Sequence, residues 1–348
     1  MIYSVFDNIA ISAISASVPK GILEINSLKE FEDAEVIDNF IKKTGIVQIH
    51  KCDFDQTASD LSYSAAKVLE KSGKYKPEEI GILIDVTQTP DYRVPSTALV
   101  LHKRLELNKS CIAFDINLGC SGFVYGVSVA ASLLKTSNAS KAMVVVGDIL
   151  GRKRTKNENR PSNTSLLFGD ACAAILIEKM EGKKLEMAWM SDGTGYKALV
   201  NPYGAWKHPA EHPRVASDDI AVFNFTIDEV PSLLKEFIER TNTVIEDYDA
   251  LVLHQANMMI MKQIAKKVKM PIDKVPVSLD RFGNTSGASI PLTIVDKYGE
   301  CQDEHELNLL TSGYGVGLSW GVLSFKININ DIFPLCISED IYDDGYLD

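Results

Sequence analysis

The sequence predicts an α/β fold made of two similar halves. Short apolar runs rich in β-branched residues, typical of buried strands, alternate with amphipathic stretches that are typical of helices. An irregular stretch at 181–220, rich in glycine and proline, separates two such series. The segments 77–88 (PEEIGILIDVTQ) and 247–257 (DYDALVLHQAN) share an outline, which is a weak hint of internal duplication.

The expected elements follow this alternation along the chain. Residues 58–72 have the spacing of an amphipathic helix, and 80–86 is a β-branched run typical of a buried strand. In the first half the same signals predict strands at 111–116, 141–147 (KAMVVVG) and 168–178, and a helix at 121–136. In the second half they predict helices at 227–241 and 260–268, a strand at 250–254, and a last strand after the glycine-rich stretch 313–321.

These elements divide the chain into three parts. We expect an N-terminal half at 1–180, a C-terminal half at 181–330 and an acidic tail at 331–348. The tail ends in DDGYLD, and we expect it to pack loosely because charged terminal segments tend to fray.

Composition excludes several classes of protein. The 348 residues carry a formal net charge of −11, which argues against a nucleic-acid partner because that role needs a basic face. No apolar run approaches the roughly 18 residues of a membrane-spanning helix, and the N-terminus lacks the basic start of a signal peptide. Six cysteines without a CxxC pair favour a reducing cytoplasm, where each cysteine is buried, incidental or a nucleophile.

The first candidate for chemistry is Cys120, in the segment 115–123 (DINLGCSGF). An apolar strand ends there and a helix begins, so the helix dipole is expected to lower the pKa of the thiol. Gly119 and Gly122 are expected to leave room for a substrate. A structural cysteine in a tight turn is an equally good interpretation of this local pattern.

Three further segments carry polar groups of possible function. His254 directly follows a buried strand, where a polar side chain needs a partner; alone it would more often be a satisfied core histidine. Asn284 lies in GNTSG (283–287), which is either a surface turn or a placed amide donor. The stretch 312–321 (SGYGVGLSWG) is either a flexible turn or a source of backbone N–H groups for an oxyanion hole. Sequence spacing alone does not establish that these groups meet.

Together the motifs resemble the ketoacyl-acyl-carrier-protein synthase III family of the thiolase superfamily. GCSGF, HQAN, GNTSGAS and GLSWG stand in the family's order and at about its spacings, and FGDACAAIL (168–176) is similar to a further family motif. The resemblance runs from near residue 1 to about residue 328. It implies a five-layer α-β-α-β-α fold with two similar halves, and a homodimer.

The resemblance also implies a reaction and a role for each residue. Cys120 would hold the acyl group as a thioester, and His254 and Asn284 would bind the thioester carbonyl of the malonyl unit during decarboxylation. The backbone N–H groups of Cys120 and Val316 would form the oxyanion hole of the condensation. Acyl-CoA or acyl-carrier protein and malonyl-acyl-carrier protein would be the thioester substrates, with no metal and no other cofactor.

Departures from the family pattern bear on the substrates. Relatives that bind coenzyme A carry a Trp and an Arg where this chain has Asn39 and Lys43, and a second Arg where it has Ser162. Lysine has no planar guanidinium that could stack on a base or form paired hydrogen bonds. An acyl-carrier protein or an unusual thioester is therefore the expected acyl donor. Val94 falls at the position that projects into the partner's acyl pocket, and its small size favours a longer or branched acyl chain.

A lysine pair, Lys266 and Lys267, stands where the family docks the acidic carrier protein, although such a run is more often a solvated helix face. Met259 stands where some relatives have a docking arginine.

Other interpretations remain open at this point. A transferase of the same fold that acylates an oxygen or nitrogen nucleophile would share Cys120 and His254. A non-catalytic partner subunit is disfavoured because the chain keeps all three reactive residues. The HxxEH spelling from His208 to His212 matches a zinc-protease motif, but Pro209 and Pro213 flank it and no helix is expected, so we expect no metal there. The sequence specifies neither the acyl length nor the pathway.

Overall fold

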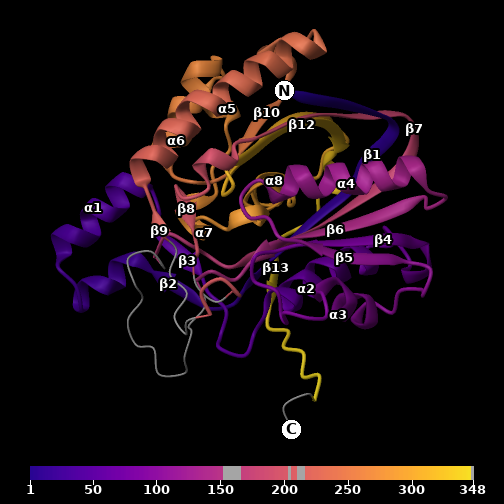
Figure 1. Cartoon of the computed structure of the whole chain (residues 1–348), viewed down its shortest axis with the longest axis horizontal. Helices are drawn as coiled ribbons and strands as arrows, with labels where there is room; N and C mark the ends of the chain where they lie inside the picture. The colour runs from indigo at the N-terminus through magenta and orange to yellow at the C-terminus, as the bar shows by residue number, and fades with distance from the viewer. Residues whose placement is uncertain (152–165, 203–204, 210–215, 346–348) are drawn as a thin grey trace.

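The chain folds into five stacked layers of helix, sheet, helix, sheet and helix, as the sequence predicts (Figure 1). The computed structural model describes residues 1–151, 166–202, 205–209 and 216–345. From top to bottom in Figure 1, α5 and α6 form the first helical layer, α4 and α8 the central one, and α2 and α3 the last. The layer helices are α2 (Ala58–Lys71), α3 (Thr97–Arg104), α4 (Gly122–Thr136), α5 (Asp219–Thr241), α6 (Met258–Val268) and α8 (Ser289–Tyr298).

The lower half of the sheet has the strand order β5–β4–β6–β7–β1. β4 (Ile80–Val86) is parallel to β5 (Ile112–Ile116) and to β6 (Lys141–Asp148), whereas β7 (Ala171–Ser191) is antiparallel to β6 and to β1 (Ile2–Pro19). Helices cover both faces, which explains why β4 and β6 are almost continuous apolar runs.

The upper half repeats this arrangement with the order β10–β11–β12–β7. β10 (Ala250–Leu253) is parallel to β11 (Glu306–Gly315), which is antiparallel to β12 (Ser319–Asn328), which in turn is antiparallel to β7. β10 therefore occupies the place that β4 has in the lower half. The similar outlines of the two segments that contain these strands reflect this structural repeat.

β1 and β7 belong to both halves of the sheet. Residues 171–178 of β7 pair with β6, and residues 186–191 pair with β12. The partner strand β1 follows β7 along this course, with register shifts between residues 7 and 9 and between residues 11 and 13. The expected boundary after residue 180 falls within β7, and residues 181–191 of the stretch expected to be irregular are strand. Within the described residues, one hydrogen-bonded sheet consequently joins nine strands: β1, β4, β5, β6, β7, β10, β11, β12 and β13.

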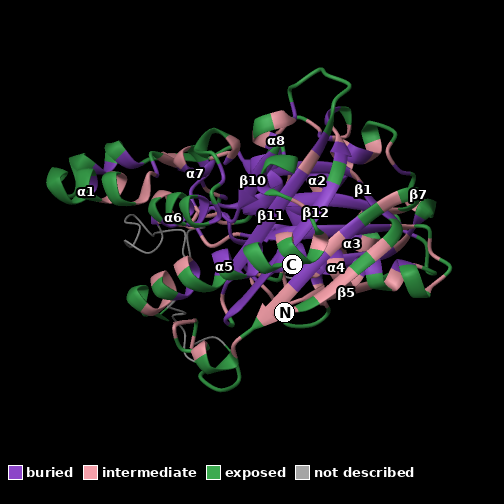
Figure 2. Cartoon of the chain, turned by 90° about the horizontal axis from the view of Figure 1, so that it is seen from above, coloured by how far each residue is buried: buried purple, intermediate pink, exposed green. Residues whose placement is uncertain are grey.

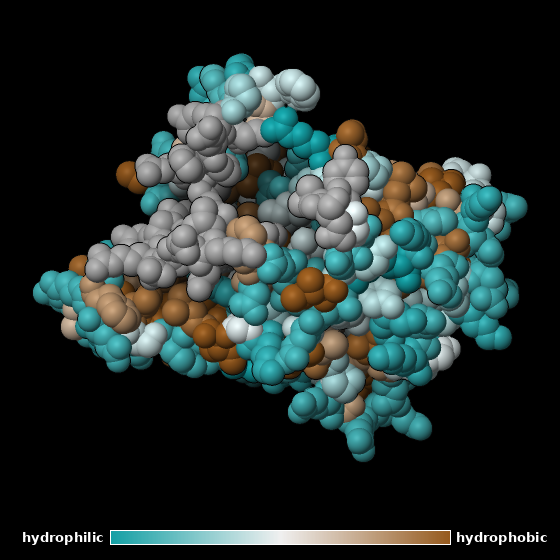
Figure 3. Space-filling model, turned by 90° about the horizontal axis from the view of Figure 1, so that it is seen from below, coloured by the Kyte–Doolittle hydropathy of each residue, from teal (hydrophilic) through white to brown (hydrophobic). Residues whose placement is uncertain are grey.

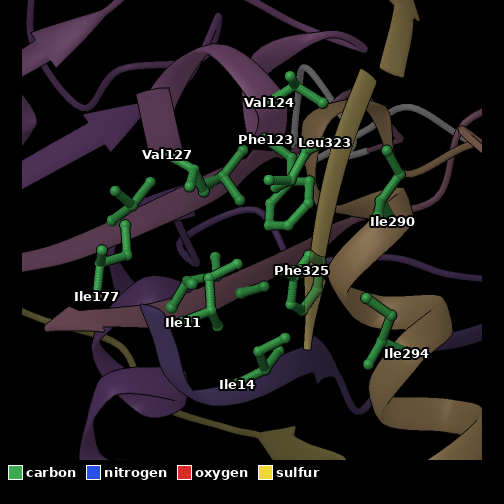
Figure 4. Close-up of a cluster of buried hydrophobic side chains, with 14 of the residues drawn as sticks. Ile11, Ile14, Phe123, Val124, Val127, Ile177, Ile290, Ile294, Leu323 and Phe325 are labelled. Carbon is green, nitrogen blue, oxygen red and sulfur yellow. The ribbon is translucent and has the colours of Figure 1, made fainter. Parts of the chain in front are cut away.

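The main hydrophobic core lies between the two halves of the sheet. Figure 4 shows Phe123 of α4, Ile290 of α8, Phe325 of β12 and Ile14 of β1 pointing into the same space. Because sheet covers α4 and α8 on opposite sides, most of their residues are buried. Figure 2 shows that the central strands are buried as well. The central helices are thus held rigidly, and the loops at their N-termini carry the residues of interest.

The remaining elements are short. Two small sheets pair β2 (Ile22–Glu24) with β3 (Gln48–His50) and β8 (Leu199–Val200) with β9 (Ala216–Ser217). α1 (Ala34–Thr44) lies at one end of the molecule beside α6, and α7 (Leu279–Phe282) precedes α8. The face seen from below has a hollow near its upper centre (Figure 3). Within the described ranges, no helix is long and apolar enough to cross a membrane.

The acidic tail is bound to the body of the protein, so the expectation of loose packing is wrong as far as Tyr342. β13 (Cys336–Ser338) pairs with the end of β1 in parallel. Beyond it, the Tyr342 N–H donates to Asp60 Oδ1 at 3.0 Å. The Arg104 guanidinium, whose side chain is 4% exposed, pairs with Asp60 and with Asp340 of the tail. The Asp340 carboxylate thus gives the buried Arg104 guanidinium a second anionic partner, as a buried cation requires partners.

Candidate active site

Cys120 lies in the turn between β5 and α4, at the position that the sequence predicts. Ser121 is the N-cap residue of α4 and the cysteine is 7% exposed. The prediction of a lowered pKa is wrong: burial, reinforced by the nearby Asp148 carboxylate, raises the pKa of the thiol to about 12. Burial removes the hydration of the thiolate and so favours the neutral thiol. Nucleophilic attack by Cys120 therefore requires a group that accepts its proton.

The glycines around Cys120 make room for protein atoms. A Cβ on Gly119 would lie 2.3 Å from Gln88 Oε1, and one on Gly122 would lie 2.7 Å from Val86 Cγ1. The space beside each glycine is thus occupied by protein side chains, whereas we expected it to be left for a substrate. A Cβ on Gly315 would lie 2.7 Å from Cys120 Cβ and 3.1 Å from its Sγ, so the end of β11 packs directly against the cysteine.

The turn between β11 and β12 carries Val316 and is fastened beside Cys120. The Ser319 hydroxyl donates to the Val316 carbonyl oxygen at 2.7 Å. The hydroxyl oxygens of Ser319 and Ser121 are also 2.7 Å apart. Because Ser121 directly follows Cys120 in the chain, this pair of contacts fixes the glycine-rich turn relative to the thiol.

His254 follows β10 and is buried. The backbone N–H of His254 donates to the Ser312 carbonyl oxygen at 2.9 Å. In the side chain, Nδ1 lies 2.7 Å from Ser289 Oγ, and the Tyr314 ring packs edge-on against the imidazole. Burial lowers the pKa of His254 to about 3, so the imidazole is neutral at pH 7. Since Nδ1 faces Ser289, Nε2 is the ring nitrogen left for a substrate.

Asn284 is oriented by its own loop. Its backbone N–H donates to the Leu167 carbonyl oxygen at 2.8 Å, and its carbonyl oxygen accepts from the Gly169 N–H at 3.2 Å. A Cβ on Gly169 would lie 1.9 Å from the Phe282 carbonyl oxygen, which explains the glycine of the FGD segment. Asn284 Oδ1 accepts from the Ser286 N–H at 2.9 Å, so the amide Nδ2 is left as a donor.

Ser286 connects the three predicted residues. Its backbone N–H holds Asn284, its backbone forms a hydrogen bond that raises the pKa of His254, and its hydroxyl interacts with Cys120. Residues from both halves of the fold therefore meet around Ser286. This serine lies within the GNTSG segment, but nothing in the sequence pattern distinguishes it from its neighbours.

A second residue that the sequence analysis missed is Asp148, the last residue of β6, which is 1% exposed. Its Oδ1 accepts hydrogen bonds from the Gln88 N–H at 2.6 Å and from the hydroxyls of Thr87 and Thr89 at 3.0 and 3.3 Å. Burial raises the pKa of the Asp148 carboxyl to about 6. The signal in the sequence was a carboxylate at the end of the apolar run 141–147.

The other predicted residues lie on the surface. Val94, in the segment before α3, is 84% exposed, and Lys266 and Lys267 are exposed on α6. Lys267 pairs with Asp228 of α5 at 2.7 Å. Asn39 and Lys43 are exposed on α1.

Two other positions named from the sequence, Ser162 and His212, lie outside the described residues. Within the described ranges, no group of three or more His, Cys, Asp or Glu side chains is arranged to hold a metal ion.

Comparisons with known proteins find relatives that match most of the chain. Residues 114–193 match the family described as 3-oxoacyl-[acyl-carrier-protein] synthase III, and residues 238–327 match its C-terminal family. A beta-ketoacyl-[acyl-carrier-protein] synthase III of Wolbachia pipientis is 33% identical over 87% of this chain and 94% of its own length. The enzyme of that name from Clostridium perfringens SM101 is 31% identical over 92% of this chain and its whole length.

The same relationship is found among solved structures. A 3-oxoacyl-(acyl-carrier protein) synthase from Burkholderia xenovorans superposes with a TM-score of 0.91 at 31% identity, covering 97% of this chain and 99% of that one.

Proposed function

The chain belongs to the beta-ketoacyl-[acyl-carrier-protein] synthase III family, and on this premise we propose that it condenses a Cys120-bound acyl group with malonyl-acyl-carrier protein. The product is a 3-oxoacyl-acyl-carrier protein of fatty-acid or polyketide synthesis. The observation that carries the proposal is the pair of neutral donors, His254 and Asn284, held around Ser286 beside a buried thiol.

The first half-reaction transfers the acyl group to the enzyme. The Cys120 sulfur attacks the carbonyl carbon of the donor thioester, and the donor's thiol leaves. The carbonyl oxygen becomes an oxyanion during the attack and is stabilised by the backbone N–H groups of Cys120 and Val316. The hydrogen bonds that tie the β11–β12 turn to Ser121 support this role, since an oxyanion hole must be positioned before the reaction.

The second half-reaction extends the chain. The malonyl carboxylate leaves as carbon dioxide, and the electron pair passes to an enolate whose oxygen accepts hydrogen bonds from His254 Nε2 and Asn284 Nδ2. Each donor contributes about 3 kcal/mol in a site closed to water. The enolate carbon then attacks the acyl carbonyl, and the Cys120 thiolate leaves. This sequence of steps uses thioester substrates and needs no metal or redox cofactor.

An acyl-carrier protein is the donor we favour. Asn39 and Lys43 are exposed on α1 and offer neither an aromatic stacking surface nor a guanidinium to a nucleotide. We place the carrier on α6 around Lys266 and Lys267, since the net charge of −11 would repel an acidic partner elsewhere. Lys267 already neutralises Asp228, so Lys266 would contribute more of the attraction.

The enzyme is further proposed to be a cytoplasmic homodimer. β5 forms an edge of the sheet as described, and apolar residues around it are exposed: Ile112, Leu99 of α3, and Val94. A second copy pairing at this edge would cover these residues and bring Val94 to the partner's site. Light scattering on the purified protein would test the dimer. A reducing compartment fits the six cysteines, none of which is in a disulfide bond.

Two measurements test the reaction. Intact-mass spectrometry with a panel of acyl-CoAs and acyl-carrier proteins should show an acyl adduct that Cys120→Ala abolishes. Adding malonyl-acyl-carrier protein should then release carbon dioxide and a 3-oxoacyl product. An adduct without carbon dioxide release would favour transfer to an oxygen or nitrogen nucleophile instead, and no adduct with any donor would favour a non-catalytic subunit.

A further inference from the structure

Two buried polar atoms near Cys120 lack a hydrogen-bond partner of ordinary length within the described part of the chain. They are Asp148 Oδ2 and Ser286 Oγ. Both residues are 1% exposed, and leaving such groups unpaired is costly. Asp148 Oδ1, in contrast, is saturated by three donors from the segment after β4. The carboxylate is thus held firmly by one oxygen while the other is left available.

The two unpaired atoms lie on a path that leads to the thiol. The interaction with the Ser286 hydroxyl lowers the pKa of both Cys120 and Asp148, so this hydroxyl is near both groups. A Cβ on Gly119, the residue before the cysteine, would lie 3.1 Å from Ser286 Oγ. A serine hydroxyl both donates and accepts, so it can take a proton from one neighbour and give one to the other.

We propose that Ser286 and Asp148 form a proton relay that accepts the Cys120 proton during acylation and returns it to the departing thiol. As the sulfur attacks the donor carbonyl, its proton moves to Ser286 Oγ while the Ser286 proton moves to Asp148 Oδ2. When the tetrahedral adduct collapses, the carbon–sulfur bond to the donor breaks. The proton then travels back through Ser286 to the leaving thiolate, so that Asp148 is again ionised.

This inference rests on the proposed function and concerns its first half-reaction. It supplies the proton acceptor that a buried thiol with a raised pKa requires. His254 is a poorer acceptor, because burial lowers the pKa of its imidazole to about 3, whereas the Asp148 carboxyl has a pKa of about 6. A base is most effective when its pKa is near the working pH.

Other titratable groups face Asp148 from the elements around it. Besides Cys120, they are Asp85 of β4 and Cys172 of β7, and burial raises the pKa of each well above its ordinary value. These raised pKa values favour the uncharged form of each group. Asp148 consequently ionises with little competition, and the rate of acylation should rise as the pH increases through about 6.

The test compares two reactions of the same thiol in Asp148→Asn. The asparagine oxygen can still accept hydrogen bonds from Thr87, Gln88 and Thr89, so we expect the local structure to be retained. Acylation by acetyl and octanoyl thioesters of acyl-carrier protein and of N-acetylcysteamine should slow by about 100-fold. Alkylation by iodoacetamide also requires loss of the Cys120 proton, so it should slow as well if Asp148 accepts that proton. It should be faster if the carboxylate only raises the pKa of the thiol.

The direction of these two changes and their pH dependence separate the explanations. A relay predicts that both reactions slow and that both lose the rise in rate near pH 6. If both slow but keep that rise, Asp148 has only a structural role; if both accelerate, it only raises the pKa of the thiol. Either result overturns the proposal, as does an unchanged acylation rate in Asp148→Asn.

Three further variants complete the design. Ser286→Ala keeps the backbone contacts and should slow acylation as Asp148→Asn does, whereas Asp148→Glu should restore part of the rate and the rise near pH 6. Asp85→Asn is the matched control, a buried carboxyl one strand away, and should keep that rise. A wild-type protein that no thioester acylates would overturn the proposed function itself; an acylated wild type with unaffected variants would overturn the relay alone.

Discussion

Replacing Gly315 by alanine should separate the placement of Cys120 from its chemical identity. The new methyl group would lie 2.7 Å from Cys120 Cβ, whereas ordinary contacts begin at 3.4 Å. One of the two must therefore retreat by about 0.7 Å, and buried overpacking of this kind costs about 1–3 kcal/mol of stability. The backbone of Gly315 has a negative φ that alanine adopts, so the strain is steric and local.

The larger effect is expected on catalysis. A displacement approaching 1 Å between reacting atoms costs on the order of 100-fold in rate, so acylation of Cys120 in Gly315→Ala should fall by about this factor. The assay is intact-mass spectrometry over a time course, with thermal unfolding measured in parallel. Gly193→Ala is the control, since a Cβ there would meet no atom within 4 Å. An acylation rate equal to that of the wild type would refute the close packing of β11 against the thiol.

The remaining predictions address the other parts of the site and the fold. His254→Ala and Asn284→Ala should each lower carbon dioxide release by about 100-fold or more while Cys120 is still acylated, because each removes one enolate donor; equal loss of acylation would contradict this division. Lys266→Glu should raise the KM for malonyl-acyl-carrier protein more than Lys267→Glu does, since Lys267 is paired with Asp228; equal or absent effects in steady-state kinetics would argue against docking there. Arg104→Ala should lower the free energy of unfolding in urea by about 3–5 kcal/mol, because Asp60 would remain buried without its partner. Asp340→Asn should cost much less, as the Asp340 side chain is 35% exposed, and the reverse order would be evidence against this account.

Patterns local in sequence predicted most of the fold. A short, continuous apolar run such as 141–147 is typical of a strand that is covered on both faces. The similar outlines of 77–88 and 247–257 hinted at the repeat, because β4 and β10 hold equivalent places in the two halves. The long strand at the N-terminus was not predicted, since its outer residues are partly exposed and lack a continuous apolar run.

The electrostatics could not be predicted in the same way. The helix N-terminus at Cys120 was visible in the sequence, but the burial that raises the pKa of the thiol depends on β11 and on the loop after α7. The docking of the tail was hidden for a similar reason, because Arg104 and Asp340 are 236 positions apart. Ser286 and Asp148 acquire a role only through residues that the fold brings to them.

The course of β1 has a consequence for how the protein is made. Residues 2–19 leave the ribosome long before residues 172–189, which are their neighbours in the sheet. For about half of its synthesis the chain therefore carries an apolar strand with an unsatisfied edge, at the stage when such edges invite association with other chains. The upper half of the sheet must wait longer still, for β11 and β12. We therefore expect folding to be slow and to depend on protection of the newly made strand β1. A soluble partner protein fused before β1 should shield this strand and raise the yield of folded enzyme. The same partner fused after the last residue should raise the yield less.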